Sequence, residues 1–201
     1  GPTGTGKTEL VKLIAQTMGE GTHFERIDMS EFTEEHSVAK LVGAPPGYVG
    51  YDQGSRLTRT IQNHPRTVLL LDEIEKAHPK VHTIFLQAMD NAKITDSQGE
   101  EIDLRNVAIF MTSNAGAREI QKSSLGLGDG ASVQKSKNKA AIENMFAPEF
   151  RGRLDAIVHF NKLDRAVMGK IVIKAVKELE ETRAMKKNNI KISITEEAVN
   201  F

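Results

Sequence analysis

The sequence predicts an α/β fold in which helices flank a parallel sheet. Two continuous apolar runs, residues 66–73 (RTVLLLDE) and 107–114 (VAIFMTSN), have the composition of strands buried on both faces. A shorter strand candidate lies at residues 23–30 (HFERIDMS), and segments of helical periodicity separate the three. Strands and helices that alternate in this way are typical of parallel sheets with helical crossovers.

Local patterns predict the other elements of this first part of the chain. Apolar residues recur at helical spacing in four segments, 9–18, 34–42, 52–64 and 78–92. A hairpin is expected over residues 93–106, with its turn near Gln98-Gly99. Beyond a polar stretch at about 122–138, interpreted as a loop, we expect short helices at 140–146 and 148–154 and a strand at 156–160 (AIVHF).

The pattern changes after Asn161. A long helix at about 164–186, a strand at 191–195 (KISIT) and a further helix are expected there. We therefore predict a large α/β domain over residues 1–161 and the beginning of a small, mostly helical domain over 162–201. The chain opens inside a motif and stops within an apparent helix, so we interpret it as part of a longer polypeptide.

Composition excludes several classes of protein. Among 201 residues, 27 Lys and Arg balance 27 Asp and Glu, which argues against a dedicated binder of nucleic acid or of anionic membranes. The absence of cysteine rules out disulfides and cysteine-based metal sites. No apolar run approaches the ~20 residues of a transmembrane helix, and no signal peptide is recognisable. We expect a soluble cytoplasmic protein.

The first eight residues, GPTGTGKT, match the phosphate-binding pattern G-x-x-x-x-G-K-[ST] and precede a predicted helix. Glycines let successive N–H groups point at phosphate oxygens at a helix N-terminus. Lys7 supplies a positive charge for the β- and γ-phosphates, and the Thr8 hydroxyl is a candidate Mg²⁺ ligand. The candidate nucleotide-binding residues of this loop are Gly1, Pro2, Thr3, Gly4, Thr5, Gly6, Lys7 and Thr8.

Acidic and amide side chains end the two apolar runs, at the sheet edge where ligands of open α/β sheets bind. Asp72 suits the Mg²⁺ shell, and Glu73, the next residue, suits a base that orients or polarises the attacking water. Asn114 is a candidate to hold the γ-phosphate or that water, although on its own it is equally consistent with a helix N-cap. His78 and His82 lack the H-E-x-x-H pattern and a third ligand, so we expect no metal there.

Together these motifs resemble the AAA+ ATPases, and more narrowly the Clp ATPases. GPTGTGKTE, DMSEF, GAPPGYVGYDQG, LLLDEIEKAHP, MTSNAG and PEFRGRLD are similar to the second ATPase module of Clp unfoldases, with the ClpA type closest. The resemblance implies a P-loop AAA+ fold with Gly1–Thr8 as Walker A, Asp72 and Glu73 as Walker B and Asn114 as sensor 1. The strand before Walker A and the sensor 2 arginine of the family are absent from this sequence.

The resemblance also implies that Arg153 is an arginine finger, which reaches the ATP of a neighbouring subunit and stabilises charge on the γ-phosphoryl oxygens. An ion pair of Arg153 with Asp155 or Glu149 is the structural alternative. Arg151 is the second candidate for the finger.

Residues 43–50, GAPPGYVG, match the principal pore loop of the family. Tyr48, with Val49 beside it, is then the aromatic that grips a protein chain passing through a hexamer pore. The alternative is a Tyr48 that folds back to cover an edge of the core. The hairpin at 93–106 is either a second pore-facing loop or a solvated turn.

Leu125-Gly126-Leu127 lies in an otherwise hydrophilic stretch between sensor 1 and the finger. ClpA-type unfoldases carry an Ile-Gly-Leu tripeptide in this position that inserts into a cleft of the ClpP peptidase, and Leu for Ile conserves volume. ClpB-type disaggregases lack this insertion, so the tripeptide favours the peptidase partner. The alternative is a loop anchored to its own core.

We therefore predict an ATP-dependent unfoldase and translocase module that uses ATP and Mg²⁺ in a homohexamer and feeds a ClpP-type peptidase. Unfolded or tagged proteins are the expected substrates, adaptor proteins are further candidate partners, and neither nucleic acid nor membrane is expected. The alternatives are a ClpB-like disaggregase, an AAA+ nucleic-acid motor or loader, and a silent scaffold, the last disfavoured by the intact Lys7, Asp72 and Glu73.

Overall fold

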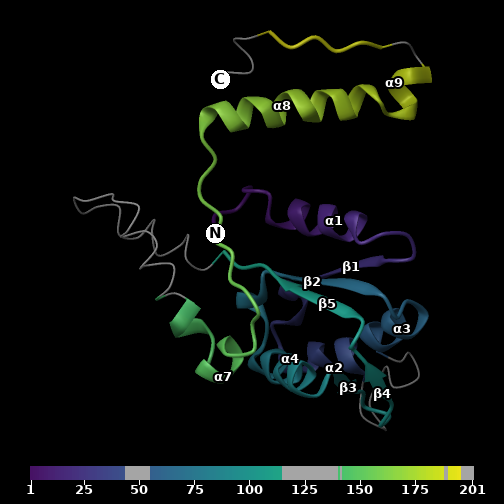
Figure 1. Cartoon of the computed structure of the whole chain (residues 1–201), viewed down its shortest axis with the longest axis vertical. Helices are drawn as coiled ribbons and strands as arrows, with labels where there is room; N and C mark the ends of the chain where they lie inside the picture. The colour runs from purple at the N-terminus through teal and green to yellow at the C-terminus, as the bar shows by residue number, and fades with distance from the viewer. Residues whose placement is uncertain (44–54, 115–139, 141, 188–189, 196–201) are drawn as a thin grey trace. The chain divides into compact units, whose positions relative to one another are not determined.

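The computed structural model describes residues 1–43, 55–114, 140, 142–187 and 190–195. The chain divides into two compact units, residues 1–160 and 161–201, which are described separately (Figure 1). In the part of the chain that the structure describes, no helix has the length and apolar character needed to cross a membrane.

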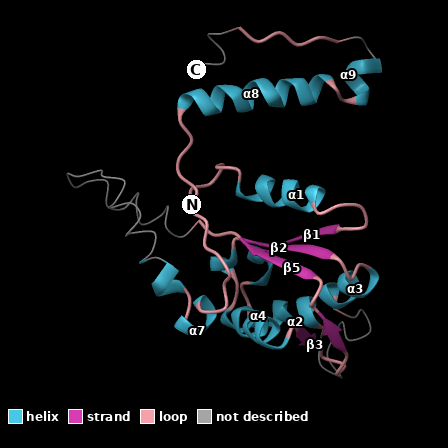
Figure 2. Cartoon of the chain, in the orientation of Figure 1, coloured by secondary structure: helices cyan, strands magenta, loops and turns pink. Residues whose placement is uncertain are grey.

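A parallel sheet of three strands forms the centre of the first unit (Figure 2). The strands are β1 (His23–Asp28), β2 (Thr67–Asp72) and β5 (Val107–Met111), in the order β1-β2-β5. Every residue of β2 is buried, whereas β5 is half-buried. Asp28 is in register with Asp72, so the carboxyl ends of β1 and β2 lie side by side. The predicted α/β fold with a parallel sheet and flanking helices is confirmed.

Helices cover both faces of this sheet. On one face, α1 (Lys7–Thr17) packs Val11 and Ala15 against Val68 and Leu70 of β2. The alternate β2 residues Leu69 and Leu71 face the larger core on the opposite side, as the two-residue period of a strand requires. Helices on that side are α2 (Glu35–Val42), α3 (Arg56–Asn63) and α4 (Pro79–Asn91), with two short 3₁₀ turns, η1 (Met29–Phe32) and η3 (Ile74–Lys76).

The predicted hairpin is present beside α4. Strands β3 (Lys93–Thr95) and β4 (Glu101–Asp103) pair antiparallel. The turn lies near Gln98-Gly99, as predicted. Gly99 has a φ of 82°, which favours glycine, and its N–H donates to the Asp96 carbonyl at 3.1 Å. The last helix of the first unit is α7 (Pro148–Arg151).

The predicted strand at residues 156–160 is wrong. These residues form neither strand nor ladder, and Val158 is 69% exposed. An apolar run becomes a strand only where a neighbouring strand completes its hydrogen bonds, and no described strand pairs with this segment. Its apolar composition therefore predicted the wrong local structure.

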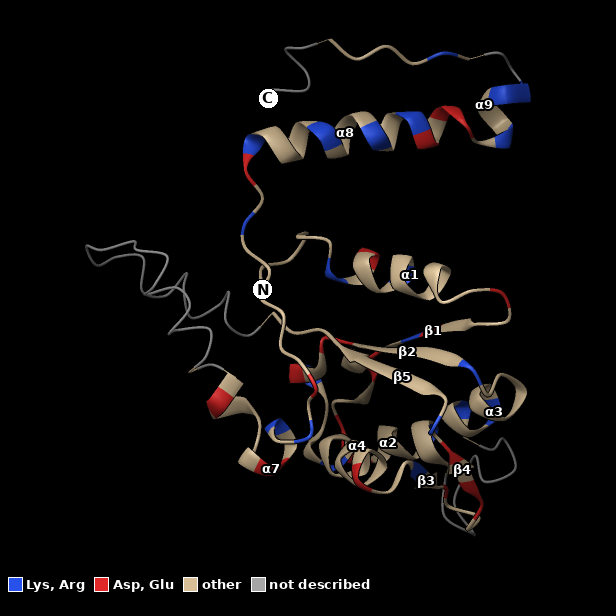
Figure 3. Cartoon of the chain, viewed as in Figure 1, with Lys and Arg blue, Asp and Glu red and all other residues tan. Residues whose placement is uncertain are grey.

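The second unit contains α8 (Arg165–Glu180) and α9 (Arg183–Lys187) in place of one long helix. Asp164 caps α8 by accepting the Val167 N–H at 2.7 Å. At the interruption the Thr182 N–H and hydroxyl both donate to the Leu179 carbonyl, at 3.1 and 2.7 Å, so an i−3 bond replaces the i−4 bond of the α-helix. Lys, Arg and Glu residues are interspersed along α8 (Figure 3). The strand expected at 191–195 is also wrong, since that segment is irregular.

Candidate active site

The phosphate-binding loop leads directly into α1. Gly4 and Gly6 have φ values of 76° and 88°, in the left-handed region that favours glycine. Gly6 is the N-cap of α1, and without a side chain it leaves the first N–H groups of the helix open to an anion. The Gly1 nitrogen donates to the Ser113 carbonyl at 3.0 Å, which fastens the start of the loop to the end of β5.

Lys7 folds back over the loop. Its Nζ donates to the carbonyls of Gly1 and Pro2, at 2.9 and 2.6 Å, and to Oδ1 of Asn114 at 2.7 Å. An ammonium has three donors, so these contacts saturate it. Burial lowers the pKa of Lys7, and the nearby carboxylates, Asp72 foremost, oppose that shift. The lysine is thus held where the phosphate loop, β2 and β5 meet.

Asp72, at the end of β2, is buried and both of its oxygens have donors. The Thr112 hydroxyl donates to Oδ1, and the Thr8 hydroxyl donates to Oδ2 at 3.3 Å. Arg26 of β1 donates to the same Oδ2 through Nε at 2.7 Å, and its Nη2 forms an ion pair with that oxygen at 2.7 Å. Asp72 therefore joins Thr8 of the phosphate-binding motif to β1 and to Thr112, the residue that follows β5.

Glu73 follows Asp72 in a strained conformation. Its φ of 56° is unusual for a residue other than glycine, and such strain is commonest at functional sites. Its N–H donates to the Thr112 hydroxyl at 3.2 Å. On the side chain, Oε1 accepts from Nδ2 of Asn114 at 2.9 Å, and Oε2 forms an ion pair with Lys76. The carboxylate is held at both oxygens.

Asn114 connects Lys7 to Glu73. Its Oδ1 accepts from Lys7 and its Nδ2 donates to Glu73, while its backbone N–H donates to Oε1 of Glu75 at 2.9 Å. The buried Oε2 of Glu75 has no hydrogen-bond partner among the described residues. The structure therefore brings together Lys7, Thr8, Asp72, Glu73 and Asn114, while the catalytic role of Asn114 stays a prediction.

Thr8 and Asp72 fit the Mg²⁺ assignment. The Thr8 hydroxyl and Oδ2 of Asp72 are hard oxygen donors 3.3 Å apart beside the open end of α1. His78 and His82 do not converge, because the first accepts from Lys80 N–H and the second contacts the Ile74 carbonyl at 3.2 Å. Within the described ranges, no group of three or more His, Cys, Asp or Glu residues is arranged to hold a metal ion.

The candidate arginine fingers are held separately from this network. Arg153 is half-exposed and pairs with Asp90 at the end of α4, in place of the Asp155 or Glu149 that the sequence suggested. Arg151 pairs with Glu143 at 3.3 Å. Which of the two acts on a nucleotide stays a prediction.

Several predicted residues lie outside the described part of the chain. They are Tyr48 and Val49 of the candidate pore loop and Leu125, Gly126 and Leu127 of the candidate docking tripeptide. Their proposed roles rest on sequence alone.

Four residues that complete the site were not predicted from the sequence. They are Arg26, Thr112, Glu75 and Lys76. Arg26 carried a usable signal, because it is a basic residue within the strand candidate at residues 23–30. Thr112 lies in the motif MTSNAG, but the family resemblance assigns it no role. The contacts of Glu75 and Lys76 depend on η3, whose tight turn was not predicted.

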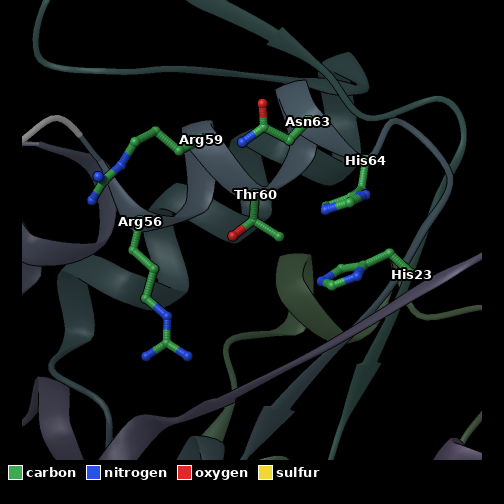
Figure 4. A pocket seen from close by; sticks show the side chains of 6 residues that line it. All are labelled: His23, Arg56, Arg59, Thr60, Asn63 and His64. Carbon is green, nitrogen blue, oxygen red and sulfur yellow. The ribbon is translucent and has the colours of Figure 1, made fainter.

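A separate hollow of about 360 Å³ lies at the amino end of β1 (Figure 4). It is lined by His23, Arg56, Arg59, Thr60, Asn63 and His64. The rings of His23 and His64 stack with centroids 4.1 Å apart, and Arg56 is paired with Glu25 at 2.8 Å. The hollow shares no lining residue with the site around Asp72.

A phosphate loop, two acids after the central strand and an amide after its neighbour, all at one sheet edge, define a P-loop nucleotide-binding fold. Comparison with known families agrees, since residues 1–157 match the AAA domain (Cdc48 subfamily). The chain belongs to this family and is an ATPase module.

Its relatives are Clp ATPases, which confirms the resemblance in the sequence. A ClpA homolog protein of Fuscovulum blasticum is 48% identical over 198 residues, covering 98% of this chain and 24% of the relative. The ATP-binding subunit ClpC of the ATP-dependent Clp protease of Staphylococcus saprophyticus is 46% identical over 206 residues, covering 98% and 25%. The chain thus spans about a quarter of the length of these relatives.

A solved structure shares the fold. The closed-state reconstruction of Hsp104 with ATPyS and FITC casein superposes with a TM-score of 0.75 at 43% identity, covering 90% of this chain and 31% of that one. That agreement supports the P-loop α/β fold independently of the short motifs.

Proposed function

We propose that this chain is the ATP-hydrolysing module of a protein unfoldase and translocase. The observation that carries the proposal is the convergence of Lys7, Asp72, Glu73 and Asn114 on one sheet edge. Each of these side chains has at least one hydrogen bond or ion pair to another part of the site. Nucleotide binding follows from the family, and the role of each residue is part of the proposal.

The phosphates of ATP would take the place of the carbonyls that Lys7 now contacts. Moving the ammonium from Gly1 and Pro2 to a phosphate exchanges neutral acceptors for charged ones, which form stronger hydrogen bonds. The open N–H groups at the start of α1 hold the same phosphates. Thr8 and Asp72 would hold Mg²⁺, which would neutralise part of the phosphate charge.

Glu73 is the residue that accepts a proton from, or orients, the attacking water. Asn114 holds Oε1 and Lys76 holds Oε2, so the carboxylate has one orientation relative to the phosphate loop. Because Asn114 also contacts Lys7, movement of the lysine toward phosphate changes the contacts that position Glu73. This link is a physical route by which phosphate binding alters the geometry of the base.

Hydrolysis is coupled to movement of protein substrates through a homohexamer pore. Tyr48 and Val49 grip the chain by burying apolar area, which needs no defined substrate sequence. Arg153 acts in the neighbouring subunit, where a guanidinium stabilises charge on the transferred phosphoryl group. Its half-exposed position and surface pair with Asp90 support this role, since a weak pair releases the arginine readily.

A ClpP-type peptidase is the proposed partner, and cytoplasm the proposed compartment. One relative is the ATP-binding subunit ClpC of an ATP-dependent Clp protease, which supports the peptidase. So does the tripeptide Leu125-Gly126-Leu127, since six such loops on one ring bind tightly through effective concentration even when each is weak. A disaggregase without a peptidase is the second candidate, favoured by the structural similarity to Hsp104.

The test is degradation of a tagged folded protein by the full-length protein, with and without a ClpP-type peptidase. We expect ATP-dependent degradation only when the full-length protein and the peptidase are both present. The matched variant changes Leu125 and Leu127 to Ser. It should lose degradation while retaining ATP hydrolysis and unfolding, because docking alone is removed.

The outcomes separate the two candidates. Wild-type affinity of the double serine variant for the peptidase would reject the docking role. ATP-dependent release of protein from aggregates, without any gain from a peptidase, would favour the disaggregase. Salt-dependent DNA binding with DNA-stimulated hydrolysis would favour a nucleic-acid motor instead.

A further inference from the structure

Asp72 already has a cation beside it in this structure. The Arg26 guanidinium donates to Oδ2 through Nε at 2.7 Å and forms an ion pair with it through Nη2, also at 2.7 Å, and the Thr8 hydroxyl donates to the same oxygen at 3.3 Å. Oδ2 is therefore the oxygen that faces Thr8, the other residue assigned to Mg²⁺. These two donors occupy both lone-pair sites of Oδ2, and the charge of Arg26 lies beside it, so Oδ2 has no free position for a metal ion.

The strand pattern explains why Arg26 reaches this oxygen. Alternate residues share one face of a strand, so Arg26 lies on the same face of β1 as Phe24, which packs with α1. Arg26 is in register with Leu70, two residues before Asp72 on the neighbouring strand. Its long side chain therefore extends toward the carboxyl edge of the sheet and ends at Asp72.

The geometry points to Arg26 as a resident counter-ion that must leave Oδ2 before a divalent cation can bind there. This inference rests on the nucleotide site proposed above and adds a residue that opposes metal binding. A guanidinium keeps its charge at all accessible pH values, so it competes with a metal ion by charge as well as by occupancy. Thr8 need not leave, because a hydroxyl can donate to Oδ2 and still present a lone pair.

Asp28 is a second carboxylate with which Arg26 can pair after it leaves Asp72. Oδ2 of Asp28 lies 3.9 Å from Nη2 of Arg26, two residues further along the same strand face. Its other oxygen accepts from the N–H and the hydroxyl of Ser30, at 2.9 and 2.6 Å. These hydrogen bonds, the Ser30 side chain first, lower the pKa of Asp28 and keep it ionised. Arg26 can thus exchange Asp72 for Asp28 by a small movement.

The experiment measures binding of Mn²⁺, an oxygen-seeking substitute for Mg²⁺, to the full-length protein in the presence of ADP. Electron paramagnetic resonance of free Mn²⁺ gives the affinity without any turnover. Arg26→Gln should bind Mn²⁺ about tenfold more tightly, because a cation is removed from beside the site. Arg26→Lys, which keeps the charge, should stay near wild type. Arg56→Gln is the matched control, since it removes an arginine that pairs with Glu25 of β1 instead of with Asp72. The Mn²⁺ affinity of this variant should equal that of wild type.

Asp28→Asn tests the exchange itself. It should weaken Mn²⁺ binding in the wild-type background, and this effect should vanish when Arg26 is already Gln, because the arginine transmits it. Equal weakening in both backgrounds would show that Asp28 acts directly on the metal and would overturn the exchange.

The remaining outcomes separate the inference from the proposed function. Unchanged or weaker Mn²⁺ affinity in Arg26→Gln, with normal binding by wild type and a normal melting temperature, would overturn the inference alone. Absence of Mn²⁺ binding with ADP in the wild-type protein would overturn the proposed function and this inference with it.

Discussion

The two ends of strand β1 carry polar groups of similar kinds in different arrangements. At the carboxyl end, Arg26 and its neighbours surround the buried Asp72, and contacts run on to the phosphate loop and to β5. At the amino end, His23, Arg56 and His64 line an open hollow (Figure 4). Arginine and hydroxyl groups are present at both ends, so composition alone does not distinguish them.

The two ends of β1 differ in how their polar groups are hydrogen-bonded to one another and in how deeply they are buried. Removing a partner from a hydrogen-bonded network around a buried carboxylate is costly, because it leaves a buried polar group without a bond unless another partner replaces it. Exposed groups at the amino end exchange protein partners for water at little cost. Substitutions should therefore have large effects at the carboxyl end and small ones at the amino end, and three predictions test this contrast in decreasing order of effect.

Glu73→Gln should give the largest effect. The amide keeps the shape of the side chain and can still accept from Asn114, but it cannot take a proton from water. ATP turnover should fall by about 10²–10⁴-fold while nucleotide affinity is retained. Phosphate release and equilibrium binding of a nucleotide analogue measure the two quantities.

His64→Gln is the control at the other end of β1, where a ring stacked on His23 is removed. Turnover should not change. If Glu73→Gln kept turnover within tenfold of wild type, or if His64→Gln lost as much activity, the functional contrast between the two ends would be wrong.

The acids at the site could be placed from sequence because they follow a recognisable buried strand. Parallel strands end at one sheet edge, so two apolar runs that stop at Asp72 and Asn114 predict that these residues approach each other. The contact of Arg26 with Asp72 could not be derived in the same way. It requires the register of β1 against β2, and one residue of slippage would turn Arg26 to the other face.

Thr112→Val should have the next largest effect, which is a loss in the free energy of unfolding. The buried Thr112 hydroxyl donates to Asp72 and accepts the Glu73 N–H, and valine has the same shape without the hydroxyl. Leaving these buried groups without a partner should lower the free energy of unfolding by about 1–3 kcal/mol. Thr60→Val in the hollow is the matched control, expected to cost about 0.5 kcal/mol or less. Equal losses in chemical denaturation would contradict the contrast.

The errors in the fold have a related cause. Residues 156–160 and 191–195 have the composition of strands, but strand formation depends on a partner elsewhere in the chain. Helices close their hydrogen bonds locally, so α1, α2 and α4 were predicted from periodicity. The break between α8 and α9 was not predicted because periodicity does not report the local contacts at Thr182, whose N–H and hydroxyl both donate to the Leu179 carbonyl.

Arg56→Gln should have the smallest effect. Arg56 donates to Oε1 of Glu25 through Nε and Nη2, at 3.1 and 2.8 Å, and to the Arg26 carbonyl at 3.2 Å. The arginine is 45% exposed, so water replaces its contacts when it is removed. Glu25 retains a second neighbour in His23, whose Nε2 lies 3.6 Å from Oε2. The expected loss in the free energy of unfolding is about 0.2–1 kcal/mol, as for other exposed pairs.

The Arg56→Gln measurement also gives the smallest loss in the free energy of unfolding expected in this comparison. Chemical denaturation at low and high salt should show this small loss shrinking as salt increases, because exposed charges are screened. A loss above about 2 kcal/mol that persists in high salt would mean that the less exposed Glu25 depends on Arg56 as a buried charge depends on its partner. The amino end of β1 would then be organised around Glu25 much as the carboxyl end is organised around Asp72, and burial of the acid would matter more than its position in the sheet.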